Sequence, residues 1–223
     1  MFDNKTRKEE RLKNRIPDTV SQSTYNLIIG ALIIYGLLMN GLLAYVSTEF
    51  MLQVNPIIFI IAYFISCMIG TVITHRSSNP IISFVGYNLI AVPIGLLLSL
   101  VVPFYSIDLV LSAILITAAI TGIMMALSVV FPNIFEKMGI ALFVSLLIAI
   151  IAETIAMLCG YGGDAFNWIF VILFSLYIGY DWHKAQQYSK TVDNAVDCSV
   201  DLYLDIINIF LRILRLLGRS SKK

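Results

Sequence analysis

The sequence contains little charge for its length. Asp, Glu, Lys and Arg make up 13% of the 223 residues and hydrophobic residues 59%, whereas a soluble globular domain carries about 25% charge. So few ionic groups exclude an ordinary water-soluble protein. The formal net charge of +1 gives no reason to expect nucleic acid as a partner. The composition predicts an all-α protein that crosses a lipid bilayer several times.

The sequence also lacks the patterns of a disulfide framework or a metal centre. The cysteines Cys67, Cys159 and Cys198 lie in or beside apolar segments without CxxC spacing, which is typical of small buried side chains. His75 and His183 lie at the ends of apolar segments, and neither has a partner at metal-ligand spacing. We therefore expect no resident cofactor.

Seven apolar segments are long enough to span a membrane, since about 20 helical residues cross its hydrocarbon core. The segments cover about 25–47, 55–75, 81–102, 107–131, 138–159, 166–184 and 196–217. The connections are short, so we expect one seven-helix membrane domain over residues 25–218. Residues 1–24 are expected to form a polar tail with a short surface helix ending at Pro17, and 219–223 a basic C-terminal tail.

Lys and Arg alternate along the connections in a way that predicts a cytoplasmic N-terminus. The tail is basic, and basic residues recur in every second connection, at Arg76, Lys137, and Lys184 with Lys190. Seven spans then place the C-terminus outside, although its Arg and Lys residues favour the inside. Either the last helix spans despite its basic end, which we favour, or it is shallow and re-entrant.

A polar stripe runs along the last apolar segment. Asp197, Asp201 and Asp205 follow one another every fourth residue, and Asn208 and Arg212 continue the series. In a helix these side chains share one face. Because an ionised carboxylate facing hydrocarbon costs a few kcal/mol, the stripe is predicted to face protein or a water-filled cavity.

Asp181, near the end of the sixth segment, and Asp205, near the middle of the seventh, are predicted to form a pair. The connection between the two segments is short, so the helices should be antiparallel neighbours. Two carboxylates in a desolvated site cannot easily both ionise. The pair can therefore bind a proton, a cation such as Ca²⁺, or each in turn.

Other residues could complete this site or give it a purely structural role. Arg76 or Arg212 could supply a counter-charge. Glu153, isolated among apolar residues, either faces the same cavity or is a protonated packing residue. The structural alternative is that the acids pair with Arg212, Asn208 and backbone only to hold helices together.

The end of the chain resembles a known family over residues 174–218. It reads FSLYIGYDWHKAQQ, followed by AVDCSVDLYLDIINIFLRILRLLG, and is similar to the signature of the Bax inhibitor-1 family, close to its bacterial members. The resemblance implies a seven-helix fold with the last helix central. It also implies a pH-sensitive Ca²⁺ leak controlled by two aspartates that match Asp181 and Asp205. A basic residue at the end of the second helix locks the closed state of bacterial members, and Arg76 is its nearest match.

The hypothesis is therefore a passive, pH-sensitive calcium leak gated by an aspartate pair, with calcium, protons and lipid as its partners. The alternatives are a proton-coupled transporter of a small solute and a regulatory membrane protein without transport. An intramembrane aspartyl protease would need its GxGD motif on the helix after the YD motif. Here the similar Gly162-Gly163-Asp164 comes before Tyr180-Asp181, in a connection. We expect no enzyme, and a location in the bacterial inner membrane.

Overall fold

The computed structural model describes residues 19–161 and 163–220. The expected surface helix ending at Pro17 and the two C-terminal lysines, Lys222 and Lys223, lie outside these residues.

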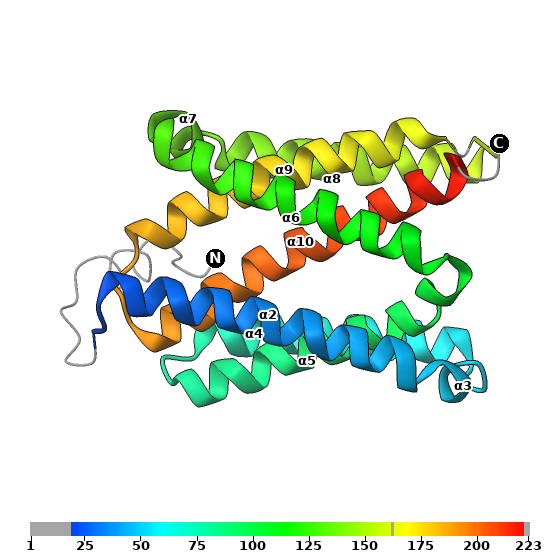
Figure 1. The fold of residues 1–223 in the computed structure, drawn as a ribbon, viewed down its shortest axis with the longest axis horizontal. Coiled ribbons are helices and arrows are strands. Elements are labelled where there is room, and N and C mark those ends of the chain that lie inside the picture. The colour runs from blue at the N-terminus through cyan, green and yellow to red at the C-terminus, as the bar shows by residue number, and fades with distance from the viewer. Residues whose placement is uncertain (1–18, 162, 221–223) are drawn as a thin grey trace. The chain divides into compact units, whose positions relative to one another are not determined.

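The described chain is helical throughout. Its long helices are α2 (Gln22–Val46), α4 (Pro56–Arg76), α5 (Pro80–Ser99), α6 (Ile107–Val130), α8 (Gly139–Leu158), α9 (Asp164–Gln187) and α10 (Val192–Ser220). Short helices, α3 (Thr48–Met51), η1 (Val102–Phe104) and α7 (Pro132–Lys137), join some of them. The described residues contain no strand, only an isolated bridge between Thr19 and Thr191. The all-α prediction is confirmed (Figure 1).

The long helices match the predicted apolar segments. Six of them, α2, α4, α5 with its 3₁₀ extension, α6, α8 and α9, are long and apolar enough to cross a membrane. The seventh, α10, has 29 residues. At about 1.5 Å per residue it is longer than the hydrocarbon core, which is about 30 Å thick. It carries more charged residues than any of the six others. The chain is an all-α, multi-pass membrane protein.

Local signals explain where several helices begin. Asn55 and Asn79 accept hydrogen bonds from the N–H groups of Ile57 and Ile81, each at 2.9 Å, and each is followed by proline at the first helical position. This arrangement satisfies a free N–H and starts the helix at the proline. The hydroxyl of Thr191 accepts from Asn194 N–H at 3.1 Å, so α10 begins one turn earlier than the apolar pattern predicted.

The structure divides into two compact units. The first comprises the described residues up to 104 with 187–203, and the second comprises 105–186 with 204–220. The continuous helix α10 contributes its first part to one unit and the remainder to the other.

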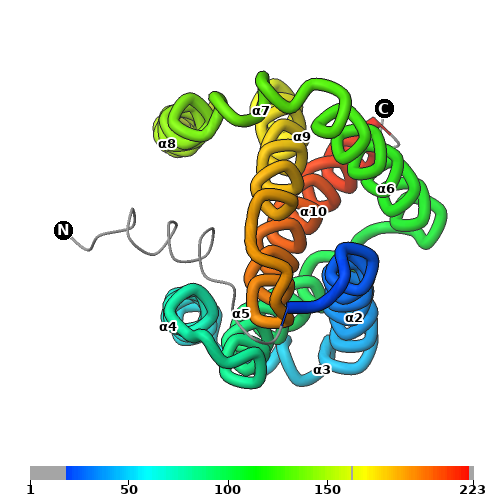
Figure 2. Tube along the Cα trace, turned by 90° about the vertical axis from the view of Figure 1, so that its left-hand side faces the viewer, coloured from blue at the N-terminus to red at the C-terminus, as the bar shows by residue number. Residues whose placement is uncertain are grey.

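In the first unit, α5 packs against both α4 and α2, and the three helices lie side by side (Figure 2). Glycines allow close approach of α4 and α5, because a Cβ placed on Gly70 would lie 2.6 Å from the carbonyl oxygen of Gly86. Such small-residue contacts are typical of membrane helices. Tyr25, Tyr87 and Tyr203 are fully buried and form the aromatic part of the core.

The second unit contains α6, the short α7, α8, α9 and the remainder of α10. Here Gly139 and Gly179 face aromatic rings, as Gly36 does in the first unit. A Cβ on Gly139 of α8 would lie 2.6 Å from the Tyr180 hydroxyl of α9, and one on Gly179 would overlap the Phe135 ring of α7. The rings fill the space that the missing side chains leave.

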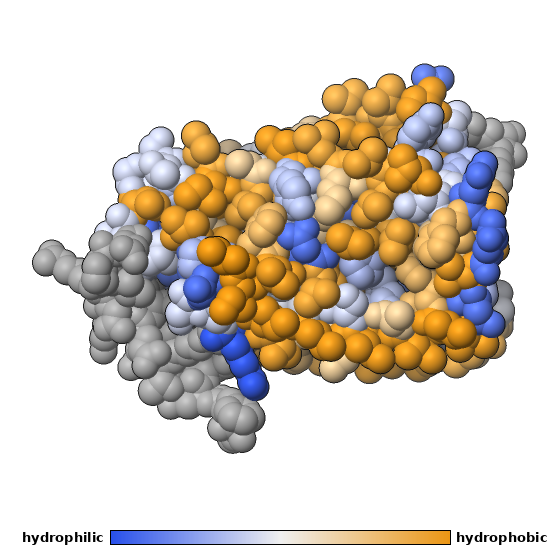
Figure 3. Space-filling view, turned by 90° about the horizontal axis from the view of Figure 1, so that it is seen from below, coloured by the Kyte–Doolittle hydropathy of each residue, from blue (hydrophilic) through white to orange (hydrophobic). Residues whose placement is uncertain are grey.

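Large hydrophobic side chains cover the surface. Leu27, Leu38, Ile57, Phe64 and Ile148, for example, are each about two-thirds exposed. On the face drawn in Figure 3 hydrophobic residues predominate. Contiguous apolar surface of this extent marks contact with lipid in a chain of membrane-spanning helices.

Candidate functional site: the acids of the last two helices

The polar stripe of α10 is largely withdrawn from the surface. Asp197 is 1% exposed and Asp205 6%, and the side chains of Asp201 and Arg212 are 22% and 14% exposed. These exposures agree with the expectation that the stripe avoids lipid. Most residues from Ala195 to Leu214 are buried, as expected for a central last helix.

The two units divide the stripe between them. Asp197 and Asp201 belong to the first unit, while Asp205, Asn208 and Arg212 belong to the second. The early start of α10 adds Asp193 to the series, one turn before Asp197. Sequence reasoning missed Asp193, although its spacing of four residues from Asp197 was a readable signal.

Asp181 of α9 and Asp205 of α10 both lie in the second unit. The side chain of Asp181 is 12% exposed and Asp205 is buried. Tyr177 of α9 lies close enough to both carboxylates to sense their charge. Tyr177 precedes Asp181 by four residues, so the two share a face of α9. Tyr177 is thus a candidate site residue that the analysis of the acids alone did not find.

A cation of the same helix lies beside Asp181. Lys184 Nζ lies 3.6 Å from Asp181 Oδ1, and its side chain is 29% exposed. Arg76, which was predicted as a counter-charge, lies exposed at the C-terminal end of α4 in the first unit. Its assignment to the aspartate pair stays a prediction.

Arg212 instead binds Glu153. Its Nη2 donates to Glu153 Oε2 at 2.8 Å and its Nη1 to Glu153 Oε1, while Nη1 also lies 3.3 Å from Asn167 Oδ1. The guanidinium lies 4.0 Å above the centre of the Phe170 ring. Two parallel hydrogen bonds from arginine are typical of an ionised carboxylate. This pair joins α8 to α10, with α9 contributing the amide and the ring.

The acids of α10 in the first unit have different partners. Asp201 Oδ1 lies 3.1 Å from Nε2 of His75, at the end of α4. Ser83 of α5 donates to Asp193 Oδ1 at 2.6 Å. His75 was interpreted from the sequence only as a residue at a span end. No pattern in the sequence indicated its contact with Asp201, which lies 126 residues further along the chain.

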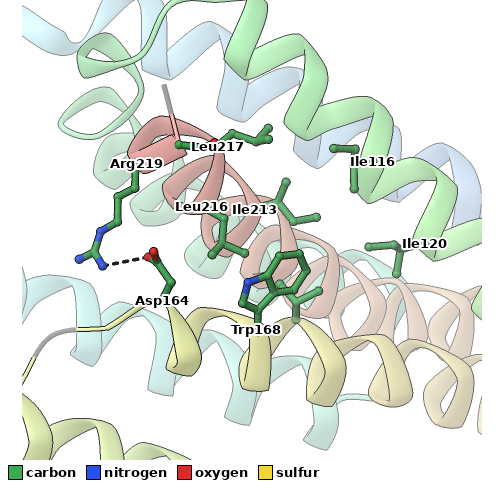
Figure 4. A pocket seen from close by; sticks show the side chains of 10 residues that line it. Ile116, Ile120, Asp164, Trp168, Ile213, Leu216, Leu217 and Arg219 are labelled. Carbon is green, nitrogen blue, oxygen red and sulfur yellow. Dashed lines mark hydrogen bonds and ion pairs between the residues drawn. The ribbon is translucent and has the colours of Figure 1, made fainter. Parts of the chain in front are cut away.

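The described residues contain no metal cluster, and the one cavity described here lies away from the predicted acids. No group of three or more His, Cys, Asp or Glu side chains there is arranged to hold a metal ion. A cavity of about 400 Å³ lies in the second unit between α6, α9 and α10 (Figure 4). Its walls are mostly apolar, and Arg219 binds Asp164 at 2.9 Å beside it. None of the predicted site residues lines this cavity.

Comparison with known proteins identifies the family to which this chain belongs. A family model described as "Inhibitor of apoptosis-promoting Bax1" matches residues 18–222. An uncharacterized protein of Helicobacter pylori is 28% identical over 208 residues, which are 91% of this chain and 87% of the relative. The Golgi anti-apoptotic protein of vaccinia virus is 29% identical over 77% of this chain and 73% of its own length. Bax inhibitor 1 of Saccharomyces cerevisiae is 36% identical over 56% of this chain and 45% of its own length. The chain belongs to the Bax inhibitor-1 family.

Proposed function

We propose that this protein is a passive calcium leak whose rate depends on pH through Asp181 and Asp205. Membership of the Bax inhibitor-1 family supports the proposal, because the signature that the chain shares with this family contains both aspartates. The proposal includes a location in a bacterial inner membrane with the N-terminus in the cytoplasm. The alternation of Lys and Arg and the relative in Helicobacter pylori support that location.

The observation that carries the proposal is that two carboxylates, one from each of the last two helices, are both largely withdrawn from the surface in the second unit. The side chain of Asp181, on α9, is 12% exposed, and Asp205, on α10, is 6% exposed. Two carboxylates in such surroundings repel each other when both are ionised. A proton held by the pair removes the repulsion. Loss of that proton favours either separation of the two helices or a cation between the two carboxylates.

Calcium suits this arrangement because its ligands are hard oxygen atoms. Asp181, Asp205 and the Tyr177 hydroxyl offer such atoms from two helices. A leak requires weak binding, since an ion that binds tightly does not leave. We therefore treat calcium as the permeant ion and not as a resident metal.

The test is calcium flux into liposomes that contain the purified protein and a fluorescent indicator, measured at several pH values. The wild type should leak at a rate that changes with pH, and Asp181→Asn and Asp205→Asn should each lose that dependence. Asp108→Asn is the matched control, because Asp108 is an exposed acid in the first turn of α6. It should keep the wild-type profile.

Other results would select another function. An unchanged pH profile of calcium flux in Asp205→Asn would contradict the aspartate-pair mechanism but would remain compatible with a calcium leak. Solute uptake that requires a proton gradient would identify a proton-coupled transporter. No calcium movement at any pH would contradict the leak altogether and favour a regulatory membrane protein.

A further inference from the structure

His75 uses both of its ring nitrogens. Nδ1 lies 3.1 Å from the carbonyl oxygen of Thr71, one turn earlier in α4, and Nε2 lies 3.1 Å from Asp201 Oδ1 on α10. All these residues belong to the first unit. Asp181 and Asp205 belong to the second unit, and Asp205 follows Asp201 by one turn of α10.

The partners of His75 determine where its protons lie. A carbonyl oxygen can only accept a hydrogen bond, so Nδ1 carries a hydrogen. A neutral imidazole with hydrogen on Nδ1 has a lone pair on Nε2, and that lone pair would point at a carboxylate oxygen. The 3.1 Å contact is favourable only with a second proton on the line between Nε2 and Oδ1. This proton makes His75 an imidazolium beside an ionised Asp201, because imidazole is a stronger base than a carboxylate.

We propose that His75 and Asp201 form a second proton-binding site, which holds the end of α4 to α10 while the shared proton is present. Loss of that proton leaves a lone pair facing a negative charge, so the contact breaks. The side chains are 36% and 22% exposed, which gives water access to the site. The proposal does not depend on calcium transport.

Other charged and titratable groups lie near the pair on both helices. On α10, Asp197 lies one turn before Asp201 and Asp205 one turn after it, and Asp193 accepts from Ser83 of α5. On α4, Arg76 follows His75 directly and is exposed. Asp201 is in direct contact with the His75 ring.

The site would act on one helix contact and not on the whole unit. The backbone contact of α4 with α5 at Gly70 and Gly86 contains no titratable group. Deprotonation of the pair should therefore release the end of α4 from α10 and leave α4 packed on α5. This is the behaviour expected of a local two-state element biased by a histidine.

The first experiment is ¹⁵N NMR of histidine-labelled protein in lipid bilayers, titrated from acid to alkaline pH. The chain has two histidines, so the His183→Gln variant leaves His75 as the sole imidazole signal. Below the titration midpoint both nitrogens of His75 should be protonated. Above it, Nδ1 should remain protonated and Nε2 should lose its proton. A ring that becomes neutral with hydrogen on Nε2 would overturn the proposal. This measurement requires no substitution of His75 or Asp201.

Variants then test the role of Asp201. Asp201→Asn should weaken proton binding by His75 about tenfold or more, since a neighbouring opposite charge shifts a titration by roughly 1–3 pH units. Asp193→Asn is the matched control, because Asp193 lies two turns away on α10 and binds Ser83. It should leave the His75 titration unchanged. The same titration midpoint in the wild type and Asp201→Asn would refute the shared proton, whatever the result of the calcium measurements.

Discussion

The acids in the two units have different kinds of partner. In the second unit two acids face arginines: Glu153 faces Arg212 and Asp164 faces Arg219. In the first unit Asp201 faces a histidine and Asp193 faces a serine hydroxyl. Arginine stays charged at every physiological pH, whereas histidine titrates near neutrality. The arginine contacts should therefore persist across this pH range, while the contact of Asp201 with His75 should respond to pH.

The packing of glycines shows a parallel contrast. In the first unit the close approach at Gly70 is against the backbone of Gly86. In the second unit Gly139, Gly179 and Gly218 each face the ring of a tyrosine or phenylalanine. A backbone inside a helix cannot move away, but a ring can rotate or shift. A side chain at Gly70 should thus be tolerated less well than one at Gly139 or Gly179.

The largest expected effect is the loss of the buried arginine pair. Arg212→Gln leaves the Glu153 carboxylate partly buried without its cation, and breaking such a pair costs about 3–5 kcal/mol. We expect this decrease in the free energy of unfolding, measured in mixed detergent micelles. The double variant Arg212→Gln with Glu153→Gln should recover part of the loss. A single variant that loses less than about 1 kcal/mol would show that the pair does not stabilise the second unit.

A smaller effect is expected from Gly70→Ala. Its Cβ would lie 2.6 Å from the Gly86 carbonyl oxygen, so α4 and α5 must separate, at a cost of about 1–3 kcal/mol. Gly41→Ala is the control, because nothing lies within 4 Å of a Cβ there. Gly179→Ala tests the comparison between the units. Its Cβ meets the Phe135 ring, which can shift, so the loss in free energy of unfolding should be smaller than for Gly70→Ala. Equal losses for Gly70→Ala and Gly179→Ala would remove the proposed contrast in packing.

Ser83→Ala should have a moderate effect on the first unit. It removes a 2.6 Å hydrogen bond to Asp193, and a hydrogen bond to a charged group contributes about 1.5–3 kcal/mol. We expect a loss near the lower end of this range in the same unfolding measurement. Ser112→Ala serves for comparison, because the exposed Ser112 hydroxyl bonds only within its own helix, to the Asp108 carbonyl at 2.7 Å. Losses of the same size in both variants would argue against a special role for the contact with Asp193.

The smallest effect should come from Arg219→Gln. The side chains of Arg219 and Asp164 are 54% and 44% exposed, and exposed ion pairs contribute at most about 1 kcal/mol. The difference from the wild type should shrink further as salt is added. A large, salt-independent loss would place Arg219 with Arg212 as a principal stabilising residue of the second unit.

Much of the helical architecture was predictable from the sequence. The expected segments differ from the observed long helices mainly at their ends, where α9 and α10 extend into polar residues. Apolar runs predict helices in a membrane because backbone groups in hydrocarbon must bond within the segment. They do not mark the ends, which depend on caps such as that of Thr191 on Asn194. The assignment of Asp181 and Asp205 as the gating pair stays a prediction.

The partners of the acids were much less predictable. The spacing of Asp197, Asp201 and Asp205 placed them on one helix face, and their exposures agree with a stripe that avoids lipid. The same spacing could not distinguish Asp201, which faces His75, from Asp205, which lies near Tyr177. Nor did it connect Glu153 to Arg212, 59 residues away.

The sequence by itself determined that this protein is a set of membrane helices with a buried polar stripe on the last one. Hydrophobicity and helical period are local properties, and the high cost of charge in lipid makes them decisive. The tertiary structure alone decided which acid meets an arginine and which meets a histidine or a hydroxyl. Those choices depend on helix packing, where glycine contacts and crossing positions bring together side chains that are distant in the chain.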